Sequence, residues 1–135
     1  MQNFKSKPTQ ILQKQEKIFY FLSDFSNFRH LLPDEVTNWE NDTDWCVFSL
    51  RGIPKIRLEM HEKVPASKVT YISGEGTPIK FSIHNSIEEL GPDLCQVQVV
   101  IQADLNPVLQ MLASKPLQNL VEMLAEKLKE EGEKL

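Results

Sequence analysis

The sequence has no long apolar run and no cluster of basic residues. A helix that spans a membrane needs about 20 consecutive apolar residues, so we expect no stable insertion into a membrane. A nucleic-acid binder needs a basic face for the phosphates, whereas the net charge here is −4 and the Lys and Arg residues are scattered. The composition therefore argues against nucleic acid as a partner.

Cysteine is also scarce, because only Cys46 and Cys95 occur, both within apolar stretches. Two cysteines alone do not make a metal site, and we interpret them as reduced, buried thiols rather than as a disulfide. The opening segment, MQNFKSKPTQ, lacks the apolar core of a signal peptide. Together these features predict a cytoplasmic protein.

Motifs of nucleotide, nucleophile and metal chemistry are missing as well. There is no P-loop, no dinucleotide fingerprint and no G-x-S-x-G motif. His61 and His84 fall on a polar strand face with another strand between them, so we do not expect them to form a metal pair. Asp42 and Asp44 share a loop that has too few carboxylates for calcium. We expect neither a cofactor nor a metal.

The chain has the size of one domain, so residues 1–135 are predicted to share one core built from a 41% hydrophobic composition. A first strand is predicted over Phe4–Leu12. The segment EKIFYFLSDFSNFRHLLP, Glu16–Pro33, has apolar residues at helical spacing that are interrupted by Ser and Asp. Ser and Asp favour helix caps, so this segment predicts two short helices with a break near Asp24–Ser26.

The region from residue 36 to residue 103 predicts an antiparallel meander. The turn-forming stretches NDTD, RGIP, VPAS, GEGTP and GPD separate six apolar segments and are short enough to join antiparallel neighbours. The predicted strands are Val36–Glu40, Trp45–Leu50, Lys55–Lys63, Lys68–Ser73, Ile79–Leu90 and Leu94–Ala103. Apolar and polar residues alternate along the later strands, so one face of the sheet is apolar and must be covered.

A C-terminal helix is the expected cover. Its apolar stripe is Leu109, Ala113, Leu117, Leu120, Leu124 and Leu128. Asn106 suits the N-cap and Pro107 the first helical position. Pro116 costs a straight helix about 3 kcal/mol, and we predict a continuous helix that bends there to follow a concave sheet. The alternative is a break, with Ser114 capping a second helix.

This order of elements resembles the helix-grip fold of the SRPBCC superfamily, which includes START lipid-transfer domains, birch-pollen-allergen-like proteins and polyketide cyclases. The resemblance rests on EKIFYFLSDFSNFRHLLP, on CVFSLRG and on LNPVLQMLASKPLQNLVEMLAEKL, the last of which is similar to the closing helix of small bacterial polyketide cyclase/dehydrase-like proteins. It implies an α+β fold with a curved seven-stranded antiparallel sheet wrapped around a long kinked C-terminal helix. Two short helices then lie between the first two strands.

The resemblance also implies a cavity between sheet and helix that holds an apolar small molecule, such as a lipid or polyketide. The two-residue alternation along the strands and the apolar stripe of the C-terminal helix predict which residues line this cavity. The candidate ligand-binding residues are Phe48, Leu58, Met60, Glu62, Tyr71, Phe81, Asn85, Val99, Leu117, Leu120 and Leu124. Within this set Glu62, Tyr71 and Asn85 are candidate polar anchors for a ligand. The alternative is that Glu62 and Asn85 lie at strand ends, where this face of the sheet is exposed to solvent.

Three functions stay open from the sequence. Binding of an apolar small molecule is our first interpretation, and no residue is assigned as catalytic. A cyclase/dehydratase-type enzyme would need an acid or base inside the cavity, for which only Glu62 and His30 are candidates. A filled interior would instead suit a module that binds a protein partner or forms a homodimer.

Overall fold

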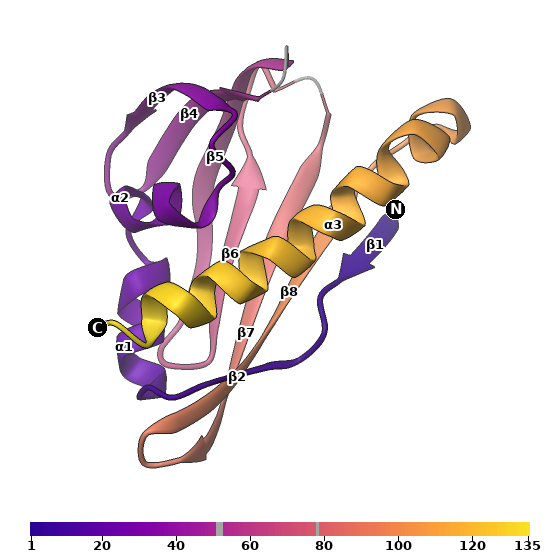
Figure 1. Ribbon diagram of the computed structural model, residues 1–135. Coiled ribbons are helices and arrows are strands. Elements are labelled where there is room, and N and C mark those ends of the chain that lie inside the picture. Colours follow the sequence, from indigo (N-terminus) through magenta and orange to yellow (C-terminus); the bar gives the residue numbers. More distant parts are fainter. Residues whose placement is uncertain (51–52, 78) are drawn as a thin grey trace.

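The computed structural model describes residues 1–50, 53–77 and 79–135. One curved antiparallel sheet forms a layer, and a long C-terminal helix lies diagonally across it (Figure 1). The strands are β1 (Gln2–Lys5), β2 (Thr9–Ile11), β3 (Val36–Asn41), β4 (Trp45–Leu50), β5 (Ile53–Val64), β6 (Lys68–Ser73), β7 (Phe81–Gly91) and β8 (Leu94–Ala103). Their order in the sheet is β1-β8-β7-β6-β5-β4-β3, and β2 also pairs with β8.

The predicted first strand is divided in two. Ser6 is buried between the parts, where its N–H donates to the Val99 carbonyl at 2.8 Å and its Oγ accepts from the Val99 N–H at 2.9 Å. Pro8 follows and has no N–H for a strand ladder. The sheet therefore has eight strands among the described residues, where seven were expected.

The two short helices and their break are confirmed. Helix α1 spans Gln15–Leu22 and α2 spans Phe25–Phe28, followed by the 3-10 turn η1 at Arg29–Leu31. The Asp24 carboxylate accepts a hydrogen bond from the Ser26 N–H at 2.9 Å and so caps α2. The six predicted later strands agree with β3 to β8, and their ends differ by two residues at most.

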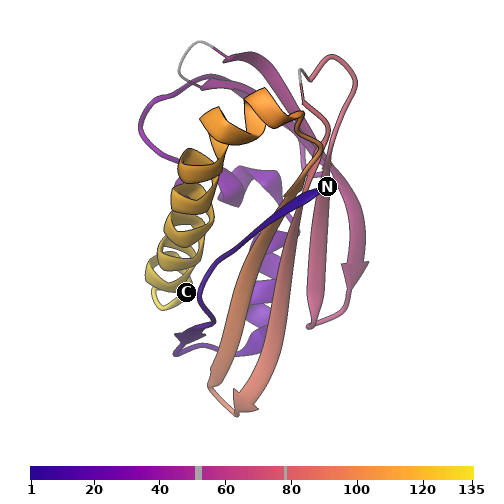
Figure 2. The ribbon, with the colours of Figure 1, turned by 90° about the vertical axis from the view of Figure 1, so that its right-hand side faces the viewer.

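The C-terminal helix, α3, is continuous over Pro107–Gly132 with Pro116 inside it. The Asn106 side chain caps its start by accepting from the Leu109 N–H. Ser114 does not cap a second helix, because its hydroxyl donates to the carbonyl of Gln110 within the same helix. Figure 2 shows the first turns of α3 running across one end of the molecule before the rest of the helix descends along the sheet.

Only the C-terminal half of α3 is deeply packed. Val121 and Leu128 are completely buried, and the helix contacts β8, β1, β2 and η1. Gly132 lets the last turn approach α1 closely, because a Cβ there would lie 2.6 Å from Ile18 Cδ1. At the other end Leu109, which the apolar stripe predicted to be covered, is exposed. The first turns of α3 extend beyond the sheet (Figure 1).

Within the described part of the chain, we find no helix with the length and apolarity that a membrane crossing requires.

Replacing Pro116 with Ala should stabilise the protein. Alanine restores an N–H for the Leu112 carbonyl, and we expect the free energy of unfolding to rise by about 1 to 3 kcal/mol in urea titrations. Because the helix before Pro116 packs little against the sheet, straightening it should cost few contacts. Lys115→Ala is the control and should change stability by less than about 0.5 kcal/mol. A destabilised Pro116→Ala variant would mean that the bend is needed to seat the rest of α3.

Candidate functional site

A cavity of about 150 Å³ lies between the inner face of the sheet and α3. The strands contribute inward-facing side chains at every second position, and α3 contributes one face as a roof. The lining residues are Phe28, Leu32, Phe48, Leu50, Ile56, Leu58, Thr77, Ile79, Phe81, Ile83, Ile101, Ala103, Leu105, Leu117, Leu120 and Leu124. All of them except Thr77 have apolar side chains.

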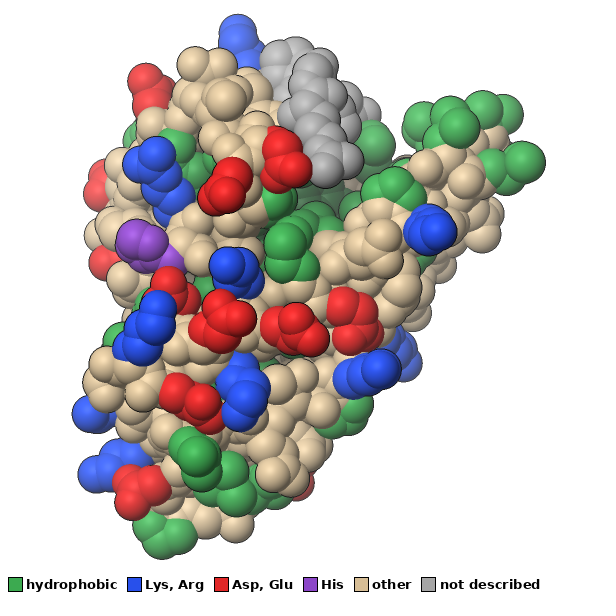
Figure 3. Space-filling view, in the orientation of Figure 1, with side chains coloured by type: hydrophobic (Ala, Val, Ile, Leu, Met, Phe, Trp, Pro, Cys, Tyr) green, Lys and Arg blue, Asp and Glu red, His purple; other side chains and the backbone are tan. Residues whose placement is uncertain are grey.

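The cavity reaches the surface beside α3. Leu117 and Leu120 on the helix are only half-buried, as are Leu50 and Phe81 on the strands opposite. In the space-filling view, hydrophobic side chains line a hollow between α3 and the strand ends across from it (Figure 3). A small molecule therefore has a route to the apolar wall that does not require the sheet to open.

The described wall contains no ionisable side chain, and its one hydroxyl is already bonded. Thr77 Oγ1 accepts from the Arg57 N–H at 3.0 Å and lies 3.2 Å from the Arg57 carbonyl, to which it donates. His30 is exposed on η1 and does not line the cavity. The wall therefore offers dispersion contacts and exclusion of water, and it offers no acid or base among the described residues.

Six of the predicted residues line this cavity. They are Phe48, Leu58, Phe81, Leu117, Leu120 and Leu124. The strand members follow the two-residue period, and the helix members follow the apolar stripe of α3.

Glu62 lies elsewhere, and the reason is a β-bulge in β5. Met60 pairs with Tyr71, but Glu62 pairs with Thr70, so His61 is an extra residue between them. One inserted residue reverses the faces, which turns Glu62 outward. Its exposed carboxylate forms an ion pair with Lys68 at 3.0 Å. The placement of Glu62 on the inner face was wrong, and Met60, although half-buried against the core, also falls outside the cavity lining.

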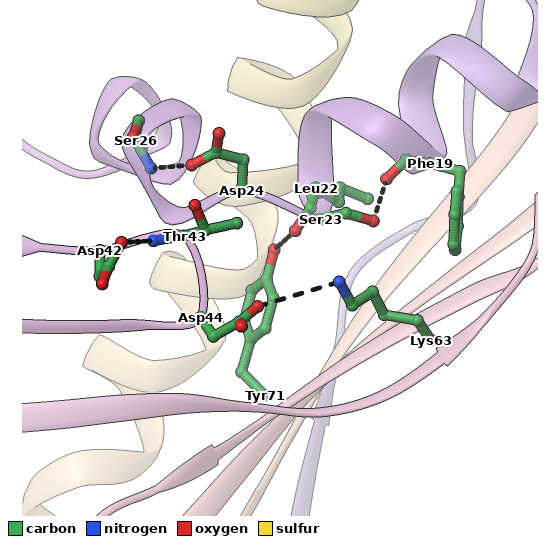
Figure 4. Close-up of polar contacts among 10 residues, drawn as sticks. All are labelled: Phe19, Leu22, Ser23, Asp24, Ser26, Asp42, Thr43, Asp44, Lys63 and Tyr71. Carbon is green, nitrogen blue, oxygen red and sulfur yellow. Dashed lines mark hydrogen bonds and ion pairs between the residues drawn. The ribbon is translucent and has the colours of Figure 1, made fainter.

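Tyr71 is buried in the core beneath the short helices rather than in the cavity wall. Its hydroxyl donates to the Leu22 carbonyl at 2.6 Å, and its ring packs against Phe25 and Phe28 at centroid distances of 4.7 and 5.1 Å. Figure 4 shows the ring pointing from the sheet to the end of α1. Burial raises the pKa of Tyr71 far above its usual value. The residue therefore anchors α1 and α2 on the sheet.

Asn85 and Val99 are also core residues. Asn85 is 3% exposed and donates from Nδ2 to the Val69 carbonyl at 3.1 Å, so it is not at a wet strand end. Val99 is 1% exposed, and its backbone pairs with Ser6. Neither side chain lines the cavity. The two-residue alternation correctly predicted that both side chains point inward. The inner face, however, has a packed part, in which these two side chains lie, and a hollow part.

Several residues that line the cavity were not among the predicted ligand-binding residues, although the sequence pattern could have identified some of them. Ile56, Ile83, Ile101 and Ala103 continue the same alternation as the nominated strand residues. In contrast, Leu32, Thr77 and Leu105 lie in connections between elements, where no periodic pattern applies. Their positions depend on how the strand ends meet α3.

Cys46 and Cys95 are free and buried, as interpreted from the sequence. Burial raises the pKa of the Cys46 thiol to about 12 and raises that of Cys95 as well. Neither lines the cavity, and the described residues contain no group of His, Cys, Asp and Glu suited to a metal ion.

Comparisons with known proteins find similarity in structure alone. No family model and no curated protein sequence matches the chain. A START superfamily protein from Mycobacterium smegmatis has a TM-score of 0.69 at 21% identity, covering 98% of this chain and 97% of its own. XoxI from Bacillus cereus has a TM-score of 0.76 at 11% identity, with 98% and 96% covered.

An enzyme shares the same architecture. Norcoclaurine synthase from Thalictrum flavum, solved in complex with dopamine and hydroxybenzaldehyde, has a TM-score of 0.70 at 11% identity, covering 96% of this chain and 84% of its own. At these identities the likeness establishes the fold. The chain has the START-like helix-grip fold, which confirms the predicted fold class and, at the level of fold, the resemblance to the SRPBCC superfamily.

Tyr71→Phe should lower the free energy of unfolding by about 1 to 3 kcal/mol, because it leaves the buried Leu22 carbonyl without its donor. Urea unfolding followed by circular dichroism measures the change. Tyr20→Phe is the matched control, since Tyr20 is 70% exposed and should tolerate the change. Equal effects of the two substitutions would contradict a structural role for the Tyr71 hydroxyl.

The two thiols should resist modification in the folded protein. With its pKa raised to about 12, Cys46 has very little thiolate at neutral or mildly alkaline pH, and access to it is blocked by burial. We expect no reaction of either cysteine with a disulfide reagent such as DTNB until urea unfolds the chain. Rapid labelling of Cys46 in native protein would show that it is accessible.

Proposed function

We propose that this protein binds an apolar small molecule in the cavity between the sheet and α3. The observation that carries the proposal is a hollow whose described walls are apolar apart from one internally bonded hydroxyl. A packed domain would normally fill such a space, because each lost contact costs dispersion energy. A ligand would recover those contacts.

The wall favours a ligand that is hydrocarbon-rich where it is buried. A polar group inside would lose its hydrogen bonds to water and find no free partner on the described wall, which costs several kcal/mol in an apolar medium (about 4 to 8). A polar end group is compatible only with the opening beside Leu117 and Leu120. An apolar cavity of about 150 Å³ in another protein binds benzene, so the present volume suits one ring or a short branched chain.

Two alternatives have less support. A cyclase or dehydratase needs an acid or base at the reacting atoms, and Glu62 and His30 both lie outside the cavity. A protein-interaction module with a filled interior does not explain the hollow. The norcoclaurine synthase complex with dopamine and hydroxybenzaldehyde is an example of small molecules bound to a protein of the same fold, and it is compatible with both binding and catalysis.

Leu120→Trp tests the proposal, because the indole would occupy the cavity. Asn119→Trp is the matched control, since it adds the same side chain at the next, exposed position of α3. In calorimetric titrations with the one-ring probe toluene, we expect Leu120→Trp to weaken binding at least tenfold, about 1.4 kcal/mol, and Asn119→Trp to leave it unchanged. Thermal unfolding checks that both variants fold.

Two further measurements sharpen the result. Denaturing extraction followed by mass spectrometry should recover an apolar compound from the wild type and not from Leu120→Trp. Trp39 stacks on the cavity-lining Phe48 with a centroid distance of 5.6 Å, so its fluorescence should respond to occupancy. Unchanged probe affinity in a folded Leu120→Trp variant would contradict the proposed binding site.

A further inference from the structure

A second pocket lies on the outer face of the sheet, behind the apolar cavity. Along β5, Ile56 and Leu58 line the cavity, whereas Arg57 and Glu59 alternate with them and lie on the opposite face. We refer to this hollow as the outer pocket. It has a volume of about 590 Å³ and is lined by Arg57, Glu59, Ser73, Gly74 and Glu75. The outer pocket is therefore charged, and only the sheet itself separates it from the apolar cavity.

Three neighbours hold the side chain of Arg57 in position. Its Nε donates to Glu59 Oε2 at 2.7 Å, and its Cζ lies 5.0 Å from the centre of the Trp45 ring. The third neighbour is Gly74, where a Cβ would lie 2.7 Å from Arg57 Cδ and 2.8 Å from Arg57 Cγ. The arginine side chain therefore occupies the space that any other residue at position 74 would need.

The terminal nitrogens of this guanidinium are free for a ligand. Neither Nη atom of Arg57 has a hydrogen-bond partner among the residues that the structure describes. The N–H donors of a guanidinium form a planar fork, and a parallel pair of them matches the two oxygens of a carboxylate. A side chain that is already held in place loses less entropy when a ligand binds. Arg57 is thus pre-positioned for a carboxylate group.

The charges of the outer pocket favour a ligand that carries both signs. Glu59 pairs with Arg57, and Glu75 adds an exposed carboxylate that has no partner among the described residues. One arginine and two glutamates give the described wall a net negative charge. Glu75 would repel a simple anion, and Arg57 would repel a simple cation. A zwitterion can place its carboxylate on Arg57 and its ammonium group on Glu75.

A stabilising ion pair is a simpler role for Arg57 and Glu59, but it explains less. The two side chains are 34% and 41% exposed, and ion pairs at that level of exposure contribute little to stability. Such a pair requires neither a glycine at position 74 nor a charged hollow beside it. Both features are expected of a site that holds the arginine for a ligand.

We propose that the outer pocket binds a small zwitterion of the amino-acid class. The carboxylate of the ligand accepts two hydrogen bonds from the Nη atoms of Arg57, and its ammonium group pairs with Glu75. Glu59 and Trp45 hold the arginine in position, and Gly74 leaves the space that this arrangement needs. The site goes beyond the proposed apolar cavity, because it lies on the other face of the sheet and takes a ligand of opposite chemistry.

A series of ω-amino acids tests the proposal with the full-length chain. Glycine, β-alanine and γ-aminobutyrate carry the same two charges at increasing separation, whereas acetate and methylammonium carry one charge each. NMR titrations that follow the Nε–H signal of Arg57 and the N–H signal of Gly74 measure each affinity at the site itself. We expect one zwitterion to bind at least about tenfold more tightly than either single-charge ion. A series in which no zwitterion exceeds acetate by that factor would overturn the proposal.

Two substitutions separate the contributions of the two charged groups. Arg57→Lys keeps the positive charge but has no planar fork, so it should weaken binding of the best zwitterion at least about fivefold. Its matched control is Arg29→Lys, which changes an exposed arginine on η1 and should have no effect. Glu75→Gln should weaken binding of the zwitterion but not of acetate. Its matched control is Glu88→Gln, at an exposed position of β7. Unchanged zwitterion binding in Arg57→Lys and Glu75→Gln would contradict the assigned contacts.

Gly74→Ala tests the space that the arginine requires. The added Cβ would lie 2.6 Å from Glu59 Oε2 and within 3 Å of two Arg57 carbons, so both side chains have to move. Because these atoms belong to partly exposed side chains, we expect the variant to fold, which thermal unfolding checks. Zwitterion binding should fall with it, and a folded Gly74→Ala variant with wild-type affinity would contradict the role of Gly74.

Toluene titrations distinguish this site from the apolar cavity. Arg57, Gly74 and Glu75 do not line the cavity, so their variants should keep the toluene affinity of the wild type. Leu120→Trp should in turn lose toluene and keep the zwitterion. Loss of zwitterion binding in a folded Leu120→Trp variant would place that ligand in the cavity and overturn the outer site.

Discussion

The packing of the last turns of α3 against α1 and the inner face of the sheet holds the rest of the molecule in place. Gly132 allows this contact because no Cβ separates the helix from Ile18 and Ile11. A helix held firmly at one end diverges from a curved sheet toward its other end. The cavity and the exposed start of α3 are thus two results of the same anchorage.

The inner face of the sheet is accordingly divided. Beneath α1 and α2 it is closed, with Tyr71 bonded to the Leu22 carbonyl and enclosed by phenylalanine rings. Beneath the middle of α3 it is hollow, and Leu117 and Leu120 are only partly covered. The closed part provides rigidity, so the hollow part can exist without loss of the fold.

Sequence patterns predicted most of the fold, because they depend on local periodicity and turn chemistry. The turn-forming stretches located β3 to β8, the two-residue alternation indicated their apolar face, and Ser and Asp located the break between α1 and α2. The failures involve features that no local period encodes. One extra residue in β5 turned Glu62 to solvent, and the pairing of Ser6 with Val99 divided the first strand. The stripe on α3 continued to Leu109, although the sheet beneath it did not.

The two-residue alternation identified the inner face of the sheet, but it could not distinguish the part of that face that is packed from the part that borders the cavity. Phe48, Leu58 and Phe81 border the hollow, whereas Asn85 and Val99 obey the same alternation and lie in packed core. That distinction depends on which helix covers each strand segment. The covering elements are far apart in sequence from the strands they cover, so a local pattern contains no information about it.

The apolar wall also has a consequence for selectivity. A site that recognises its ligand through hydrogen bonds rejects analogues that lack one polar group by a factor of about 10⁴ or more. A wall of aliphatic and aromatic side chains discriminates by shape, and each buried methylene adds about 0.8 kcal/mol, or roughly fourfold in affinity. Affinity across a homologous series would then climb in even steps and stop when the chain length exceeds the space beneath α3. Such a protein sorts molecules by size and branching rather than by functional group.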